Sequence, residues 1–390
     1  GRCGIAVLAL AIGLGVLERG LRCHADLEFG IDPPAILPPA VVADEAQVNR
    51  EALARAIDGE RQPFIVRLFK PDLWNVSHMA ELCGRRRVHL ISDATYTVLR
   101  VVQANPAVEL LFDWVLLPLL GSRTTLRQEV ASRAEIPLAT YLEGVQLQSV
   151  HQPPSVSRLP LFLRRVLPLE LAALAELVAR PRYLHDQPLS HVCPEAMDIL
   201  QVPRFLLPNW IFADEDLGDD FLKDEPTVFI GNAGCMSYPL HRNIVQDHFA
   251  LLVLRGTKRY AIFDRAQESL LEPSEVAPGV WLYGADPFSP DLVVSPGLRR
   301  ASGWMGEIGA GEVLVAHGDS AHVFENVDRD GPTVAIKFWF GTRPPARECM
   351  GLSSFDCATR LGLRAADNSS ARGAAALTVR EYIDEGRRAR

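Results

Sequence analysis

The second half of the chain alternates short apolar runs with polar segments. Apolar residues at 228–230 and 249–254 flank a polar segment at 238–243. Further along, a Gly-rich turn at 309–311 precedes an apolar run at 313–316, and a polar loop separates this run from another at 334–340. Runs of this length, separated by turn residues, read as short strands. The pattern predicts a mainly β fold in which two sheets form a small barrel.

Two polar positions inside this pattern suggest chemistry. If His241 begins a strand, side-chain alternation turns His241 and Asn243 to the same face. About eighty residues later, His322 lies between the two apolar runs of the second group. The facial triad of non-haem iron(II) oxygenases needs two histidines and one carboxylate on one side of the metal. His241 and His322 match this layout, whereas Asn243 occupies the place of the carboxylate.

Several ordered motifs carry a family resemblance. They are Tyr238-Pro239-Leu240-His241-Arg242-Asn243, then Gly256-Thr257-Lys258-Arg259, then Ala310-Gly311-Glu312 with His322, and finally Lys337-Phe338-Trp339. Upstream, 183–189 and 202–206 add two further segments. Together they resemble the jumonji-C branch of the cupin superfamily, the iron(II)- and 2-oxoglutarate-dependent oxygenases. The similarity covers roughly residues 182–340, which is under half of the chain.

The resemblance implies a double-stranded β-helix (jelly-roll) core with flanking helices and a mixed α/β N-terminal part. It also implies Fe(II) held by His241, Asn243 and His322, and 2-oxoglutarate held by the side chain at Lys258. Two further cosubstrate positions carry changed residues, because Tyr238 replaces a Thr and Lys337 replaces an inward-facing Asn. The implied activity is hydroxylation or demethylation of a protein side chain or a small molecule.

Two functions from different classes follow from these departures. One is an active oxygenase, in which Asp247 or Asp319 supplies the carboxylate that Asn243 lacks. The other is a cupin-like binding protein that kept the barrel and lost the iron. A well-placed acidic side chain beside His241 and His322 would favour the oxygenase. An interior in which Lys337 pairs with an acidic residue would favour the binding protein.

The pattern also divides the chain into parts. Residues 1–25 contain a continuous apolar run of signal-peptide length, which predicts a secretory or organellar signal, with a short membrane anchor or a buried helix as the alternatives. Residues 26–43 are rich in proline and read as a linker. We expect one domain over 44–345, with early elements at 64–69, 76–82 and 88–92, and a tail at 346–390 that ends in a helix. The proline-rich stretch near 273–296 cannot be a central strand, and it predicts either a lid beside the mouth of the barrel or a surface insertion.

Composition adds limits on partners and location. The net charge is -8 and no long basic run offsets it, so nucleic-acid binding is not expected. Membrane association is expected only through the apolar run at the start, if that run is not cleaved. The signal predicts the secretory pathway or an organelle lumen, with the cytoplasm as the alternative. The seven cysteines are widely spaced and without a Cys-x-x-Cys motif, and they predict no disulfide framework.

Overall fold

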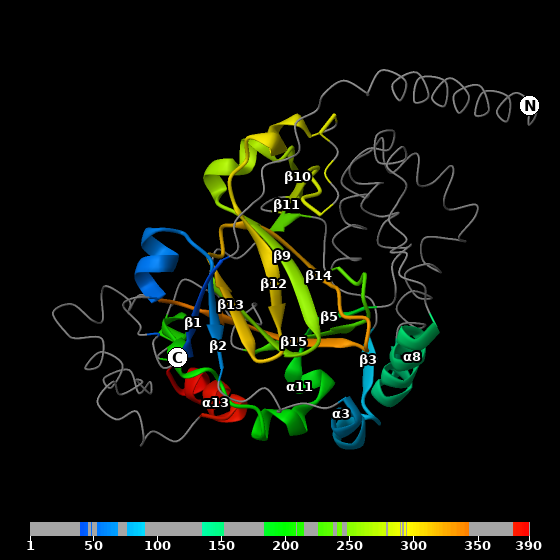
Figure 1. The fold of residues 1–390 in the computed structure, drawn as a ribbon. Coiled ribbons are helices and arrows are strands. Elements are labelled where there is room, and N and C mark those ends of the chain that lie inside the picture. Colours follow the sequence, from blue (N-terminus) through cyan, green and yellow to red (C-terminus); the bar gives the residue numbers. More distant parts are fainter. Residues whose placement is uncertain are drawn as a thin grey trace, which may run out of the picture.

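The computed structural model describes part of the chain, and its fold is β-rich with few helices (Figure 1). The described residues are 40–45, 48, 53–68, 76–89, 135–151, 183–207, 209–213, 225–236, 240–243, 248–277, 280–288, 290, 292–293, 295–342 and 377–389. The expected signal or anchor at 1–25, most of the linker and most of the tail lie outside these residues. Tyr238 and Asp247 lie outside them as well.

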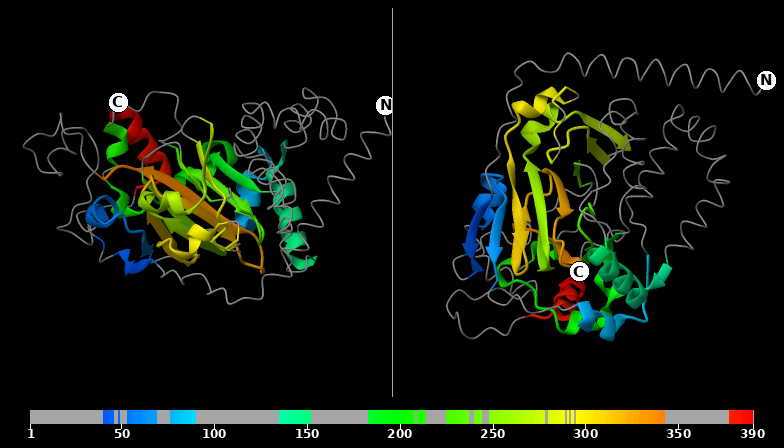
Figure 2. Two further views of the ribbon diagram at one scale, coloured as in Figure 1. Left: turned by 90° about the horizontal axis from the view of Figure 1, so that it is seen from above. Right: turned by 45° about the vertical axis from the view of Figure 1, so that its right-hand side comes forward.

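The larger sheet has seven strands in the order β1-β2-β13-β8-β15-β6-β5. β1 and β2 pair in parallel, and every other neighbouring pair is antiparallel. In Figure 2, β1 and β2 (blue) extend this sheet at one side. The strands are β1 (Val41–Asp44), β2 (Phe64–Arg67), β13 (Glu312–Ala316), β8 (His248–Arg255), β15 (Thr333–Phe340), β6 (Thr227–Gly231) and β5 (Leu184–Pro188).

The second sheet has six antiparallel strands in the order β10-β11-β7-β14-β9-β12. Its strands are β10 (Pro273–Ala277), β11 (Val280–Tyr283), β7 (His241–Arg242), β14 (Ala321–Asn326), β9 (Thr257–Phe263) and β12 (Trp304–Gly309). A separate pair joins β3 (Arg87–His89) to β4 (Glu135–Pro137). Among the described strands, no backbone pairing links the two large sheets, so neither closes on the other.

The two large sheets pack face to face through apolar side chains. Phe249 of β8 lies with its ring centroid 6.1 Å from that of Phe324 on β14, in an edge-to-face arrangement. All eight residues of β15 are buried, which explains why this strand reads as a nearly continuous apolar run. Burial of both faces of the larger sheet places the main hydrophobic core on its two sides.

Short helices surround the sheets. Figure 1 shows α3, α11 and α13 gathered at one end of the sheets and β10 with β11 at the other. α13 is the helix expected at the end of the tail, and it packs on the core through the buried side chains of Tyr382 and Ile383. The α-helices are α3 (Val76–Cys83), α8 (Leu138–His151), α11 (Leu189–Val192) and α13 (Val379–Ala389). The shorter turns are η2 (Arg55–Gly59), η4 (Pro194–Asp198), η5 (Arg204–Leu206), η6 (Trp210–Ala213), η8 (Arg265–Leu270) and η9 (Pro296–Arg299).

The structure corrects three expectations. Cys83 and Cys193 form a disulfide across 110 residues of sequence, where no disulfide framework was predicted. The last residues of the expected linker form β1, because Val41–Asp44 pair with β2. The proline-rich stretch contains two strands, and Pro273 begins β10 at the edge of its sheet, where a missing N–H costs least. In the described part of the chain, no helix is long and apolar enough to cross a membrane.

Candidate functional site

His241 and His322 come together between the two sheets. They are direct partners in the register of β7 and β14, and their ring centroids are 4.5 Å apart with the planes tilted by 54°. His322 is buried and His241 is half-buried. The ring of Phe249, from the opposite sheet, lies 4.7 Å from the ring of His322. The pair therefore sits against the apolar interior, with His241 nearer to solvent.

The hydrogen bonding of His322 determines its tautomer. Nδ1 lies 2.9 Å from the carbonyl oxygen of Ser320, and a carbonyl can only accept, so Nδ1 carries the proton. The pKa of His322 is lowered to about 4, mainly by burial; the hydrogen bond to the Ser320 carbonyl opposes this shift and the Lys337 ammonium adds to it. The ring is neutral at pH 7, and Nε2 keeps the lone pair that a metal ion requires.

Asn243 lies just after the end of β7 and is half-buried. Its buried Nδ2 atom has no hydrogen-bond partner among the described residues. An amide oxygen is a neutral ligand, so it gives a dication no charge compensation. Within the described part of the chain, no His, Cys, Asp or Glu completes a three-ligand cluster with His241 and His322. Two of the three side chains that the resemblance assigns to an iron(II) site therefore meet here, and the third, Asn243, brings no negative charge.

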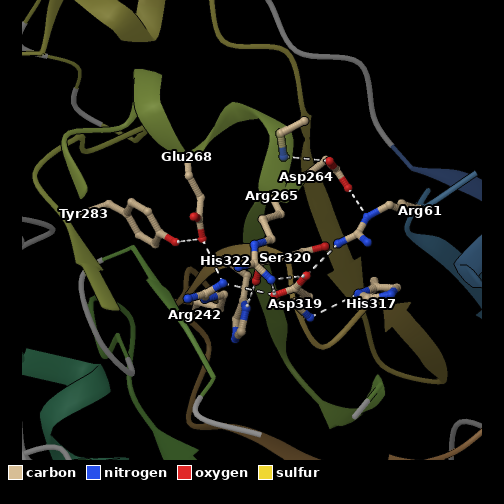
Figure 3. Close-up of polar contacts among 11 residues, drawn as sticks. Arg61, Arg242, Asp264, Arg265, Glu268, Tyr283, His317, Asp319, Ser320 and His322 are labelled. Atoms are coloured by element: carbon tan, nitrogen blue, oxygen red, sulfur yellow. Dashed lines mark hydrogen bonds and ion pairs between the residues drawn. The ribbon is translucent and has the colours of Figure 1, made fainter. Parts of the chain in front are cut away.

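Asp319, one of the two candidate replacements for the missing carboxylate, is engaged elsewhere. Its carboxylate oxygens accept hydrogen bonds from the guanidinium groups of Arg61, Arg242 and Arg265, at N–O distances of 3.1–3.3 Å (Figure 3). These arginines outweigh the effect of burial and hold the pKa of Asp319 below its usual range. Arg242 also lies 3.3 Å from Glu268. Asp319 therefore anchors the loop that leads to His322 rather than serving as a ligand.

Lys258 is buried deep between the sheets on β9, with 1% of its surface exposed. Its Nζ donates to the Asn326 Oδ1 atom at 2.6 Å and to the Tyr183 hydroxyl at 3.0 Å. The rings of Tyr183 and Phe229 lie 5.5 Å and 5.7 Å from Nζ. All of these partners are uncharged. Burial without an acidic partner lowers the pKa of Lys258 to about 7.

Lys337 forms an ion pair inside the same space. Its Nζ lies 2.6 Å from Oδ1 of Asp186, which also accepts from the Thr227 hydroxyl at 2.6 Å. Burial alone would raise the pKa of Asp186, but the Lys337 ammonium outweighs it and brings the pKa to about 2. The Lys337 ammonium also lies 4.5 Å from the centre of the Trp339 ring. Lys337, which stands where the family resemblance implies an Asn, thus forms a buried salt bridge.

His185 is a residue that the sequence reasoning passed over. Its ring lies 5.0 Å from the Phe229 ring and 5.3 Å from the Tyr183 ring. Burial lowers its pKa to about 3, and the ammonium groups of Lys337 and Lys258 contribute to the shift. The next residue, Asp186, has a φ of 52°, a left-handed conformation that β5 accommodates at a register shift. No local pattern in 184–188 signals this turn.

His248 and His317 form a second pair of rings, with centroids 4.7 Å apart. His248 Nε2 lies 2.7 Å from the Asp58 carboxylate, and Asp58 also accepts from Thr342 at 2.6 Å. Successive side chains along β8 point to opposite faces of the sheet. His248 therefore lies on the opposite face of the larger sheet from Phe249, which packs against His322.

The space between the sheets thus contains the imidazoles of three histidines, one amide, two lysines and, among the residues named above, a single acidic side chain. Such a set attracts an anion more strongly than a dication, since Lys258 has no counter-charge in the described part of the chain. No known protein family and no curated protein matches the sequence.

Proposed function

We propose that this chain is a jumonji-C-like barrel that binds a small carboxylic acid of the 2-oxoglutarate class and lacks a complete iron centre. The observation that carries the proposal is the buried Lys258, whose partners are uncharged. A carboxylate at Nζ would supply the missing charge and restore the protonated state of the lysine. This is the second of the two functions that the sequence left open.

The strand order supports the double-stranded β-helix that the proposal needs. Along the chain, β6, β7, β8 and β9 alternate between the two sheets, and β12, β13, β14 and β15 do the same. Such alternation winds the chain back and forth across one interior, as in jelly rolls. It also carries His241, Lys258 and His322 into that interior from three different strands of one sheet.

Energetics favour an anion at Lys258. A buried ammonium without a counter-ion costs several kcal/mol, and part of this cost appears as the lowered pKa. Charge-assisted hydrogen bonds contribute about 1.5 to 3 kcal/mol each, so a hydrogen bond from the Lys258 ammonium would strengthen the binding of a carboxylate. Tyr183 lies beside Nζ with its hydroxyl at 3.0 Å and offers a further polar contact.

Metal affinity is weakened at two points. Asn243 contributes no negative charge, and the Lys337 ammonium adds a smaller effect to that of burial, which is the main cause of the lowered pKa of His322. A dication bound beside His322 would meet the same repulsion. Lys337 is also committed to Asp186 in an ion pair, the arrangement that was expected of a barrel without iron.

The oxygenase remains a second candidate, which the orientation of His322 favours. The Nδ1–H of His322 is directed to Ser320, so its Nε2 is available beside His241. His241, His322 and the amide oxygen of Asn243 would hold the iron, and Lys258 would hold 2-oxoglutarate. Bound iron with this cosubstrate supplies the oxidising chemistry of the family. The residues of this chain would orient the cosubstrate and exclude water from it.

Calorimetric titration with 2-oxoglutarate in the presence of EDTA tests the proposal. The parent protein should bind one equivalent without metal. Lys258→Met should weaken binding about 10- to 100-fold, the value of one charge-assisted hydrogen bond. Arg67→Met removes a cation from an exposed position on β2 and is the matched control, which should bind like the parent.

The outcomes separate the two candidates. If the parent binds no 2-oxoglutarate without metal, or if Lys258→Met binds as well as the parent, the anion-binding proposal is wrong. If binding appears only after Fe(II) is added, and succinate then accumulates, the oxygenase is the better description.

A further inference from the structure

We propose that Cys83, Cys193 and Glu195 form a zinc site when the Cys83–Cys193 disulfide is reduced. The two sulfur atoms and a carboxylate oxygen of Glu195 lie within 4.8 Å of one another. Zinc prefers thiolate, imidazole and carboxylate ligands at about 2.0 to 2.3 Å in a tetrahedral arrangement. Among the described residues, this is the one cluster of three such donors.

The local structure brings the three donors together from two distant segments. Cys83 is the last residue of α3, and Cys193 lies between α11 and η4. Glu195 follows in the first turn of η4, so its side chain returns toward the sulfur atoms. The Cα atoms of the two cysteines are 5.2 Å apart. Small side-chain rotations suffice to separate the sulfurs around an ion after reduction.

A contact at this place supports a ligand. Glu195 Oε2 lies 3.1 Å from Cys83 Sγ. A disulfide sulfur carries no hydrogen, so in the oxidised protein this carboxylate gains no hydrogen bond from it. In the reduced protein the same approach places an oxygen ligand beside a thiolate. Zinc between them would replace an unproductive contact with two coordinate bonds.

Arg86 holds the carboxylate in a suitable orientation. Its Nη2 lies 3.1 Å from Oε1 of Glu195, the oxygen that does not face Cys83. Ligating carboxylates are usually fixed in this way by an outer hydrogen bond. Two thiolates and one carboxylate around Zn²⁺ leave one negative charge, which the guanidinium of Arg86 compensates. The site therefore has an outer partner as well as its three ligands.

Burial distinguishes the inner and outer sides of the site. Cys83 is 2% exposed and Cys193 is fully buried, whereas the side chain of Glu195 is 41% exposed. An ion reaches the site past Glu195, and the fourth position faces solvent, where water can bind. The zinc ion would take over the role of the disulfide in joining α3 to η4. Oxidising compartments would keep the disulfide, and reducing ones would allow the metal.

A phosphine and one water molecule are sufficient to reduce the Cys83–Cys193 disulfide. A phosphine cleaves the S–S bond, takes an oxygen atom from water and leaves two thiols, while the phosphine becomes its oxide. Binding of Zn²⁺ then displaces both thiol protons to the solvent. The oxidised protein cannot bind zinc in this way, because the two sulfur atoms are bonded to each other and neither is a thiolate.

The test uses the full chain in a background where the other cysteines outside the described residues, 3, 23, 349 and 357, are changed to Ser. The phosphine is removed after reduction, and Zn²⁺ is titrated against a chelating dye, with Co²⁺ absorption as a reporter of thiolate ligation. Reduced protein should bind one Zn²⁺ and show thiolate-to-cobalt bands. Oxidised protein should do neither.

Variants separate a site from general thiol binding. Cys83→Ser should abolish the cobalt bands, and Glu195→Gln should weaken zinc binding while its disulfide still forms and reports correct folding. Arg86→Met should weaken it about 10- to 100-fold, as removal of an outer partner does. Cys235→Ser, at a buried thiol away from the site, should bind like the parent. Equal zinc uptake by oxidised and reduced protein, or full binding by Cys83→Ser, overturns the proposal.

Discussion

The Lys337 ammonium and the Asp186 carboxylate form a 2.6 Å ion pair between the two sheets. The pair crosses from β15 to β5, two strands that are separated in the sheet by β6. Asp186 reaches Lys337 from a backbone with φ of 52°, which only a few non-glycine residues adopt. Removing one partner alone would leave a buried charge uncompensated, so experiments on this site must treat the two residues together.

Asn243→Asp is expected to strengthen Mn²⁺ binding, because a carboxylate adds charge where the amide has none. A triple variant that adds Lys337→Asn and Asp186→Asn should bind more tightly still, since it removes the ammonium that acts on His322 without leaving Asp186 unpaired. Calorimetric titration of Mn²⁺ into the parent and both variants measures the effect. Mn²⁺ binding by the parent that equals the triple variant would mean that another carboxylate, such as Asp247, completes the site.

Lys258→Met is expected to raise the free energy of unfolding at pH 7. The pKa of Lys258 falls from 10.5 to about 7, so burying the ammonium costs about 5 kcal/mol at this pH. Against this gain, the Asn326 and Tyr183 groups lose a donor, at about 1 to 2 kcal/mol each. The net gain should be about 2 kcal/mol.

The pH dependence of the stability gained by Lys258→Met tests whether charge burial is its cause. A lysine with a depressed pKa weakens the fold below its unfolded pKa, and the effect diminishes as pH rises from 7 toward 10.5. Urea unfolding at pH 7 and pH 9 should therefore show a smaller advantage of Lys258→Met at pH 9. A constant advantage would show that packing, rather than charge burial, explains the change.

Acid should destabilise the protein before its carboxylates titrate. Burial depresses the pKa of His185 to about 3 and that of His322 to about 4, from 6.5. Below pH 6.5 these histidines bind protons in the unfolded chain but stay neutral in the folded one. Their neutral form therefore lowers no stability above pH 6.5, and the free energy of unfolding falls as the pH drops toward 4. At pH 5 each imidazole should cost about 2 kcal/mol.

Urea unfolding at pH 7 and pH 5 measures this loss. His185→Gln should reduce the difference between the two pH values by about a third to a half, because His322 and the partly buried His317 keep their lowered pKa values of about 4. His78→Gln, at an exposed position on α3, should leave the difference unchanged. A parent protein equally stable at both pH values would contradict the burial of neutral His185 and His322.

Asp319→Asn is expected to lower the free energy of unfolding by about 2 to 3 kcal/mol, because three guanidinium groups lose their shared counter-charge. The loop that orients His322 would loosen as well, so Mn²⁺ affinity should fall in the Asn243→Asp background. Glu312→Gln, which breaks the surface pair with Arg67, should cost less than about 1 kcal/mol. An Asp319→Asn variant as stable as Glu312→Gln would show that the arginines find other partners.

The sequence by itself determined the long central strands and which residues within one strand share a face. Apolar runs at 249–254 and 334–340 are long enough to specify buried strands, and side-chain alternation places His241 on one face without knowledge of the rest. The meeting of His241 with His322 followed from two spaced motifs. The element expected at 76–82 and the helix expected at the end of the tail are also present, as α3 and α13, because their signals are local.

Only the tertiary structure decided which charges meet. The Asp186 partner of Lys337, the three arginines on Asp319 and the Cys83–Cys193 disulfide join residues 110 or more positions apart in most cases, and no local pattern records such pairings. The left-handed turn at Asp186 is likewise imposed by packing between β5 and β6. Strand periodicity is a property of neighbouring residues, whereas the partner of a buried charge depends on which distant strands the fold places beside it.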